Sequence, residues 1–169
     1  PPSRYVLLRA GCLLAAKAGA AELALKLAGE LSTSFAVTND GRATVAELLA
    51  TATYTTTGAA QTSDTLMLTG DAAKAADDWE TALAMYKSAE LIARKAQSPP
   101  ILAAAQSKLK QATYYKTEAA KLKDYLAVLK QMPDDPTANL GAGRFYCLLR
   151  DDWLQGTAML IKGSDEKLK

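Results

Sequence analysis

The chain has 169 residues and a formal net charge of +2, and its 49% hydrophobic content is enough for a sizeable core. Alanine is abundant and aromatic residues make up only 7%. This favours close-packed helices over a sheet, because alanine is a strong helix former and a poor strand former. The absence of histidine excludes the commonest general base and the commonest zinc ligand. No apolar run reaches the roughly 18 residues of a membrane span.

The first predicted helix starts at Pro2 and Ser3 and runs through about Lys17. After a turn at residues 18–20, a second helix is predicted to about Phe35. The apolar side of the first helix is expected to carry Val6, Leu7, Cys12, Leu13 and Leu14. In the second helix, apolar residues four apart predict a core stripe of Leu23, Leu27, Leu31 and Phe35.

A breaker at Thr38-Asn39-Asp40-Gly41 separates these helices from a third, predicted at residues 43–57. The end of this third helix, residues 51–58, is rich in threonine, whose β-branched side chain weakens a helix. A hydroxyl-lined ligand surface is one interpretation. We favour the other, a solvated helix end that frays before Gly58.

Residues 64–97 form the most informative stretch, with two helical patterns that meet at an acidic turn, residues 76–79. Residues three and four apart share one face of a helix. On the first helix these are Leu66, Gly70 and Ala73, and on the second they are Ala82, Tyr86 and Ala89. The small residues among them let the two helix axes approach closely, so this stretch predicts a helical hairpin.

The spacing of Leu66, Gly70, Ala82, Tyr86 and Ala89 resembles the tetratricopeptide repeat. The chain departs from that motif at three places, because Thr69 and Ala73 replace a large apolar and an aromatic residue and the terminal proline is displaced to Pro99. The resemblance implies an all-α fold of antiparallel helical hairpins stacked in a right-handed array, with about eight helices.

After Ser98-Pro99-Pro100, a typical helix start, residues 101–131 contain neither glycine nor proline. This predicts one helix of about 30 residues, roughly 45 Å long; a break near Tyr114-Tyr115 is the alternative. Two further helices are predicted at residues 136–149 and 152–161, followed by another cap at 163–166.

Asp151-Asp152-Trp153 with Gly156 repeats the earlier Asp77-Asp78-Trp79 with Ala82. Aspartate suits a helix N-terminus, where its carboxylate accepts backbone amide hydrogens. We expect each tryptophan to pack over its own helix crossing and the small residue to admit the paired helix. The recurrence is the strongest sequence evidence for an internal repeat.

The segments around Asp135-Pro136, Gly143-Arg144-Phe145, Asp152-Trp153 and Lys162-Gly163 resemble helical regions of large, mostly uncharacterised multidomain bacterial proteins. In those proteins tetratricopeptide-like helices lie beside other modules, some of them sandwich domains suggestive of carbohydrate binding. The resemblance is best from about Leu66 onward and transfers no catalytic residue. We expect residues 1–169 to form a single tetratricopeptide-like domain and to be a fragment of a longer protein.

Candidates for catalysis are few. The carboxylate pairs Asp77-Asp78, Asp134-Asp135 and Asp151-Asp152 each stand at a predicted helix start, where capping explains them, and none has the spacing of a calcium loop. Cys12 and Cys147 are predicted to be buried, inert thiols. No glycine-rich nucleotide loop is present. We therefore predict no catalytic, cofactor-binding or metal-binding residue, no cofactor, and a protein that is not an enzyme.

Charge is distributed unevenly. Residues 87–130 contain nine basic residues: Lys87, Arg94, Lys95, Lys108, Lys110, Lys116, Lys121, Lys123 and Lys130. The acidic residues there are Glu90, Glu118 and Asp124. In residues 64–86, by contrast, all the charged residues except Lys74 are acidic. With Tyr114, Tyr115 and Tyr125 this could form a stripe for nucleic acid or another acidic partner. We favour a solvent-exposed helix face whose positive charges are balanced by the negative charges of the acidic hairpin.

The sequence thus predicts a non-enzymatic helical-repeat scaffold that mediates protein–protein interaction or spacing within a larger multidomain protein. Its expected partner is a protein, a peptide or a neighbouring domain. Two alternatives remain: binding of nucleic acid or an acidic partner through residues 87–130, and an accessory domain of a carbohydrate-active or other enzyme. The sequence leaves the partner's identity, the cellular location and the oligomeric state open.

Overall fold

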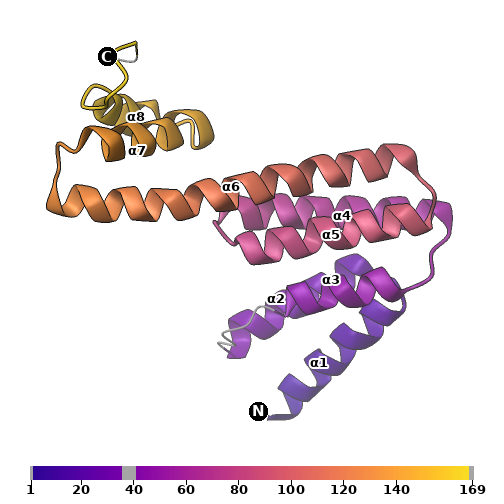
Figure 1. Ribbon diagram of the computed structural model, residues 1–169. Coiled ribbons are helices and arrows are strands. Elements are labelled where there is room, and N and C mark those ends of the chain that lie inside the picture. The colour runs from indigo at the N-terminus through magenta and orange to yellow at the C-terminus, as the bar shows by residue number, and fades with distance from the viewer. Residues whose placement is uncertain (1, 36–40, 168–169) are drawn as a thin grey trace. The chain divides into compact units, whose positions relative to one another are not determined.

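The computed structural model describes residues 2–35 and 41–167, so the predicted breaker residues Thr38, Asn39 and Asp40 lie outside the described part. The described residues form eight α-helices and no strand (Figure 1). The helices are α1 (Pro2–Lys17), α2 (Ala21–Phe35), α3 (Arg42–Thr51), α4 (Thr56–Ala75), α5 (Trp79–Lys95), α6 (Pro99–Gln131), α7 (Pro136–Leu149) and α8 (Trp153–Leu160). The predicted all-α fold is confirmed, with adjacent helices packed pairwise as hairpins. Among the described helices, none has the length and apolarity to cross a membrane.

The chain divides into two compact units, an N-terminal unit, Pro1–Ala112, and a C-terminal unit, Thr113–Lys169. The N-terminal unit holds α1 to α5 and the beginning of α6, and the C-terminal unit holds the rest of α6 with α7 and α8. Helix α6 is continuous over 33 residues, so the predicted long helix is confirmed and the alternative break at Tyr114-Tyr115 does not occur.

The third helix is shorter than predicted, since it ends at Thr51 rather than at residue 57. Ala52 and Thr55 are extended, and the Thr55 hydroxyl accepts a hydrogen bond from the Gly58 amide at 3.1 Å, which makes Thr55 the N-cap of α4. Threonine competes for backbone partners and therefore favours caps over helix interiors. The threonine-rich segment is thus a connection that opens α4 at Thr56, and the predicted frayed helix end was wrong.

The core of the N-terminal unit is built around a few large residues held between alanines. The largest completely buried apolar side chains are Leu49, Leu66, Met85, Tyr86 and Ile92. Alanines from five of the helices are also completely buried: Ala16, Ala24, Ala28, Ala46, Ala82, Ala89, Ala105 and Ala112. Small side chains let helix axes approach closely. The core is therefore packed densely by the short distances between helices as well as by its large side chains.

The predicted apolar faces of α1 and α2 were wrong in part. Val6, Leu7 and Leu14 are 61%, 73% and 68% exposed, and Leu23 is 52% exposed. The buried positions of α2 are instead Ala21, Ala24, Leu25 and Ala28. The alanine side of each helix faces the core because it permits a closer approach, and this leaves the larger leucines outside.

Glycines mark the closest helix crossings within each unit. In the N-terminal unit, a Cβ on Gly70 of α4 would lie 2.6 Å from Cε1 of Tyr86 on α5. In the C-terminal unit, a Cβ on Gly143 of α7 would lie 2.8 Å from Leu160 of α8, and one on Gly156 would lie 2.8 Å from the Cys147 backbone nitrogen. Contacts this short admit no side chain, so both hairpins depend on glycine at the crossing.

Three connections between helices share one turn geometry. Gly19, Asp77 and Gln97 each have a positive φ, of 75°, 61° and 52°. The next residue donates its amide to the carbonyl five positions back, as in Asp78 to Ala73 at 2.9 Å. This is a Schellman turn, which ends one helix while the following residue begins the next. The turn at Asp151, with φ 55°, is one residue wider, because Asp152 bonds to Tyr146 at 2.9 Å.

Candidate interaction surface

A solvent-open groove of about 820 Å³ lies between the α1–α2 turn, the beginning of α2 and the middle of α4, all within the N-terminal unit. Its lining residues are Gly19, Ala20, Ala21, Glu22, Leu23, Lys26, Gln61, Thr62, Asp64 and Thr65. The volume falls within the range of ligand and peptide sites in proteins, roughly 300–1,000 Å³. No single segment of the sequence pointed to it, since its two walls lie some forty residues apart along the chain.

The lining of the groove combines an apolar side chain with charges of both signs. Leu23 is 52% exposed, and Glu22, Lys26 and Asp64 are also exposed. The Thr65 hydroxyl is occupied, because it donates to the Gln61 carbonyl at 2.9 Å. Such a lining would be complementary to a partner that presents apolar and charged side chains together, as an extended peptide can.

A polar network fixes the helices of the N-terminal unit. The Asp71 carboxylate on α4 accepts hydrogen bonds from the Tyr86 hydroxyl at 2.7 Å and from Lys108 Nζ at 2.6 Å. Burial would raise the pKa of Asp71, but the bonds from Lys108 and Tyr86 outweigh it and hold the pKa below its usual range. Burial and the bond to Asp71 raise the pKa of Tyr86. The network therefore consists of an ionised carboxylate, a neutral phenol and a lysine that link α4, α5 and the beginning of α6.

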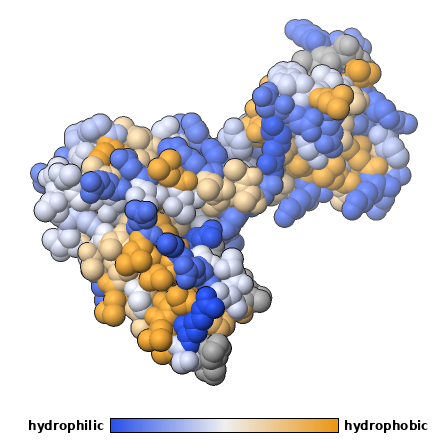
Figure 2. All heavy atoms as spheres, turned by 180° about the vertical axis from the view of Figure 1, so that it is seen from behind, coloured by the Kyte–Doolittle hydropathy of each residue, from blue (hydrophilic) through white to orange (hydrophobic). Residues whose placement is uncertain are grey.

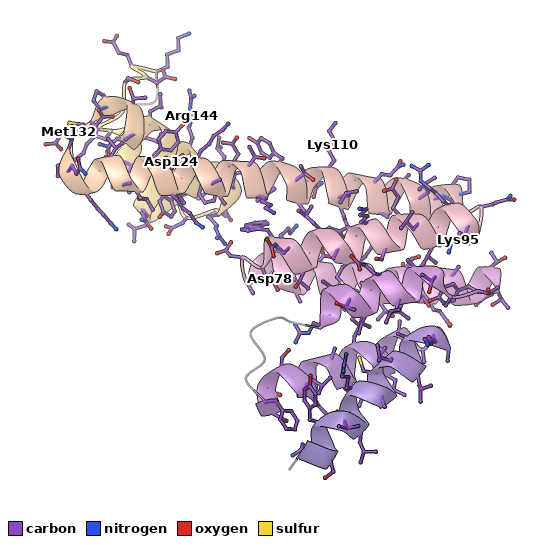
Figure 3. The ribbon with its side chains drawn as sticks, turned by 60° about the horizontal axis from the view of Figure 1, so that its bottom comes forward. Asp78, Lys95, Lys110, Asp124, Met132 and Arg144 are labelled. Atoms are coloured by element: carbon purple, nitrogen blue, oxygen red, sulfur yellow. The ribbon has the colours of Figure 1, made fainter. Side chains whose placement is uncertain are left out.

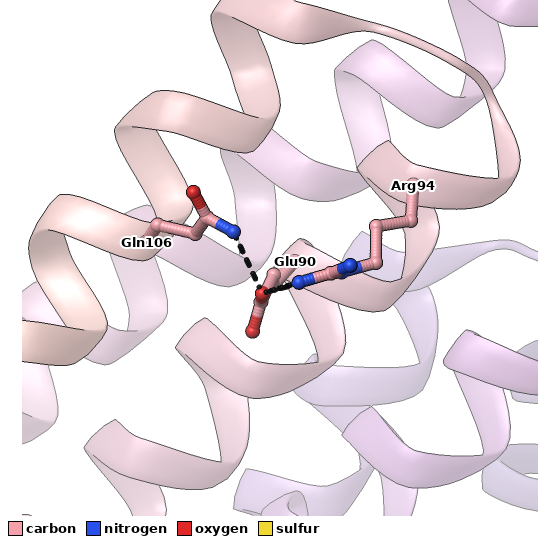
Figure 4. Close-up of polar contacts among 3 residues, drawn as sticks. All are labelled: Glu90, Arg94 and Gln106. Carbon is pink, nitrogen blue, oxygen red and sulfur yellow. Dashed lines mark hydrogen bonds and ion pairs between the residues drawn. The ribbon is translucent and has the colours of Figure 1, made fainter.

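A second contact joins α5 to α6 at the surface of the same unit. Glu90 Oε1 accepts hydrogen bonds from Arg94 Nη2 at 2.7 Å and from Gln106 Nε2 at 3.0 Å (Figure 4). The bond from Arg94, followed by that from Gln106, holds the pKa of Glu90 below its usual range. The Glu90–Arg94 ion pair lies at the solvent-exposed edge of the unit. It therefore contributes more to the orientation of these side chains than to the stability of the fold.

The aspartate pairs lie where capping requires them. Asp78, Asp135 and Asp152 are the N-caps of α5, α7 and α8, and their side chains accept from the amides of Thr81, Ala138 and Gln155 at 3.1, 2.7 and 3.0 Å. Figure 3 shows Asp78 at the turn between α4 and α5. The predicted capping role is confirmed for one aspartate of each pair. Over residues 2–35 and 41–167, no group of three or more acidic or cysteine side chains gathers as a metal site would require.

Both cysteines are buried thiols, as predicted. Cys12 Sγ donates to the Ala24 carbonyl at 3.4 Å, and burial raises the pKa of this thiol. Burial, with the nearby Asp152 carboxylate, raises the pKa of the Cys147 thiol. A raised pKa keeps the protonated, weakly nucleophilic form, so these cysteines pack as small apolar residues.

The basic residues of 87–130 lie on two helices, α5 and α6, and are divided between the two units. Arg94 pairs with Glu90 and Lys121 with Glu118 on their own helices, while Lys108 pairs with Asp71 of the acidic hairpin at 2.6 Å. Lys110 points away from α4 and α5 (Figure 3). Within the C-terminal unit, three exposed lysines of α6 share one helix face at seven-residue intervals: Lys116, Lys123 and Lys130.

The two tryptophans are equivalent in the turn but not in their packing. Trp79 begins α5 and Trp153 begins α8, each after an aspartate N-cap with nearly the same backbone. Trp79 is partly buried, whereas Trp153 is 54% exposed and its indole Nε1 donates to Asp151 Oδ1 at 2.6 Å. The prediction that each indole packs over its helix crossing was therefore wrong for Trp153, where the narrow Gly143–Gly156 crossing needs no ring.

Together these features define an all-helical protein of paired hairpins, with capped turns and a groove between α2 and α4. Comparison with family models, with curated proteins and with solved structures finds no match to this chain.

Proposed function

We propose that this chain is a non-enzymatic, tetratricopeptide-like scaffold whose hairpins stack in a right-handed array and which binds a peptide or a segment of another protein. The α2–α4 groove carries the proposal, because its mixed apolar and charged lining matches the side chains of an extended peptide. Stacked helical hairpins commonly use such grooves for partner recognition or for spacing between domains.

A recurring contact supports the repeat. Gly70 lies eight residues before the Asp78 cap and touches Tyr86, eight residues after it. Gly143 likewise touches Leu160, which follows the Asp152 cap by eight residues. The one-residue difference before the second cap corresponds to the wider turn at Asp151. Ala20 follows the Gly19 turn as Asp78 follows the Asp77 turn, so it is the equivalent position in the first hairpin. The residues eight before and eight after Ala20 are Cys12 and Ala28, and both are buried.

The motif positions that resemble the tetratricopeptide repeat support the same conclusion. Leu66, Ala82, Tyr86 and Ala89 have no exposed surface, and Gly70 is also buried. Burial of all five positions is what the motif requires of them, and it supports the proposal.

The groove is tested by panning a display library of random peptides on the 169-residue chain and measuring the affinity of the selected peptides. Lys26→Glu and Asp64→Lys reverse charges that line the groove and should weaken selected peptides at least tenfold. Lys110→Glu is the matched control, because Lys110 points away from α4 and α5, and it should leave affinity unchanged. Peptides whose binding ignores both groove variants would contradict the proposal.

The lysine stripe Lys116, Lys123 and Lys130 favours a second candidate function, binding of nucleic acid. Seven-residue spacing on a helix separates successive lysines of the stripe by a backbone rise of about 10.5 Å along one face. Phosphate binding is chiefly electrostatic, so a gel shift with duplex and single-stranded DNA and RNA should show binding at low salt that fades as salt rises. A triple Lys→Gln variant should abolish it, and no binding at low salt would dispose of this candidate.

A further inference from the structure

Two helix faces that are far apart in the sequence expose apolar side chains. The α1 face consists of Val6, Leu7, Ala10 and Leu14, in which the three larger residues are 61%, 73% and 68% exposed. The α8 face consists of Trp153, Leu154 and Ala158 of α8 and of Ile161, the helix C-cap, and its three larger residues are 54%, 89% and 62% exposed. Figure 2 shows apolar side chains gathered on the surface of the N-terminal helices and again on the C-terminal helices.

Each face is a continuous stripe rather than a scatter of single residues. Leu7, Ala10 and Leu14 are three and four positions apart, and Leu154, Ala158 and Ile161 are four and three apart. Residues at these spacings lie one above another on a helix. A single exposed leucine is normal on a protein surface, but a contiguous apolar patch marks an interaction site.

The charges around the two faces are opposite. Helix α1 carries Arg4, Arg9 and Lys17 and has no acidic residue. The α8 face begins beside the exposed carboxylates Asp151 and Asp152, and α8 itself has no basic residue. Arg150, the nearest cation before these carboxylates, lies over the Phe145 ring at 5.8 Å. Lys162, just after α8, is already paired with Asp134 at 2.8 Å. A basic apolar stripe and an acidic apolar stripe are thus present on the same chain.

We propose that the α1 face of one copy packs against the α8 face of a second copy, so that the chain self-associates head to tail. The leucines would bury one another while Arg4 and Arg9 meet Asp151 and Asp152. The interface is heterologous, which means that each copy offers one free face after pairing and that assembly continues or closes into a ring. An anionic lipid surface would suit the α1 face alone and would leave the α8 face without an occupant.

This inference goes beyond the proposed peptide binding, because no residue of either face lines the α2–α4 groove. Leu7→Glu introduces an acidic charge opposite Asp151 and Asp152, and Leu154→Lys introduces a basic charge opposite Arg4 and Arg9. The matched control is Leu68→Glu, since Leu68 on α4 is 69% exposed and belongs to neither face. Circular dichroism checks that all three variants keep the helical fold.

Sedimentation analysis of the 169-residue chain gives the test. The unmodified chain and Leu68→Glu should form species larger than one protomer that grow with concentration and weaken as salt rises. Leu7→Glu alone and Leu154→Lys alone should each remain monomeric. Their equimolar mixture should form a dimer and stop there, because the intact α8 face of the first variant pairs with the intact α1 face of the second.

Three results would overturn the inference. The first is an unmodified chain that stays monomeric at the highest concentration attainable. The second is an equimolar mixture of the two variants that stays monomeric, or a single variant that still forms species larger than one protomer. Either outcome excludes pairing of the α1 face with the α8 face. The third is a monomeric chain that binds vesicles containing phosphatidylserine, which would assign the α1 face to a lipid surface.

Discussion

At the residue scale, the contact between Gly70 and Tyr86 is the closest that a described glycine of the N-terminal unit makes. Tyr86 has no exposed surface and its hydroxyl is held by Asp71, so the ring has no room to move away from a new methyl group 2.6 Å from it. We expect Gly70→Ala to lower the free energy of unfolding by about 1–3 kcal/mol in urea denaturation, since the steric cost exceeds the better helix propensity of alanine.

Gly29→Ala is the control for that substitution. Gly29 lies inside α2, where a Cβ would meet only the end of the Arg42 side chain at 3.3 Å. Here alanine should stabilise the protein by up to about 1 kcal/mol. A Gly70→Ala variant that gained stability in the same way would contradict the close crossing of α4 and α5.

Residue types predicted the caps and the hairpin contact but not which side of α1 and α2 is buried. Asp78, Asp135 and Asp152 have one dominant local use at a helix start, so sequence reasoning placed them correctly. The burial of Ala24 and Ala28 in place of Leu23 follows from how closely helices pack. That is a tertiary property which an apolar ladder along one helix does not encode.

At the scale of helices, two of the three Schellman turns place a non-glycine residue, Asp77 or Gln97, in the left-handed region. Gln97 has φ 52° and lacks the short polar side chain that eases this conformation. Gln97→Gly should therefore raise the free energy of unfolding by about 1 kcal/mol. Gln111→Gly, the same change at an exposed position inside α6, should lower it by about 0.5–1 kcal/mol. Equal effects at the two positions would exclude the turn geometry.

The Asp71 network predicts how stability responds to acid. Because the folded pKa of Asp71 is lowered, its contribution is fully present above the unfolded pKa, about 3.9, and is lost as pH falls through the lower folded value. Asp71→Asn and Lys108→Gln should each flatten the fall in stability below about pH 4. Urea denaturation over a pH series measures this.

Lys110→Gln is the control for the acid response, since Lys110 points away from α4 and α5 (Figure 3) and should keep the slope of the unmodified chain. An unchanged slope in Asp71→Asn would show that the network does not titrate as described. The network itself was not predicted, because it joins three helices whose partners are 15 and 37 residues apart.

At the scale of helix boundaries, the sequence predicted the connections that follow α1, α4, α5, α6 and α7 but misplaced the end of α3 and with it the opening of α4. Threonine at 51–57 weakens a helix interior and also caps a helix start, and only the tertiary fold decides between the two uses. The long helix 99–131 was predictable because nothing in its sequence interrupts it.

At the scale of the whole molecule, the proposed functions depend on surfaces: the α2–α4 groove and the α1 and α8 faces. These surfaces are the features that the sequence predicted least well. The groove needs α2 and α4 side by side, and the exposed α1 and α8 faces emerge only once the core is known. The expectation of a scaffold rested on the hairpin pattern. The groove is where we propose that a partner binds, a location that the hairpin pattern does not specify.

The most direct test of the central claim maps a selected library peptide onto the chain by NMR, through the amide chemical-shift changes that it causes. We predict that the largest changes fall in the α1–α2 turn, the first turns of α2 and the groove-lining part of α4, residues 19–26 and 61–65. Changes confined to the lysine stripe of α6, or spread over the surface without maxima in these two segments, would contradict a scaffold that binds its partner in the α2–α4 groove.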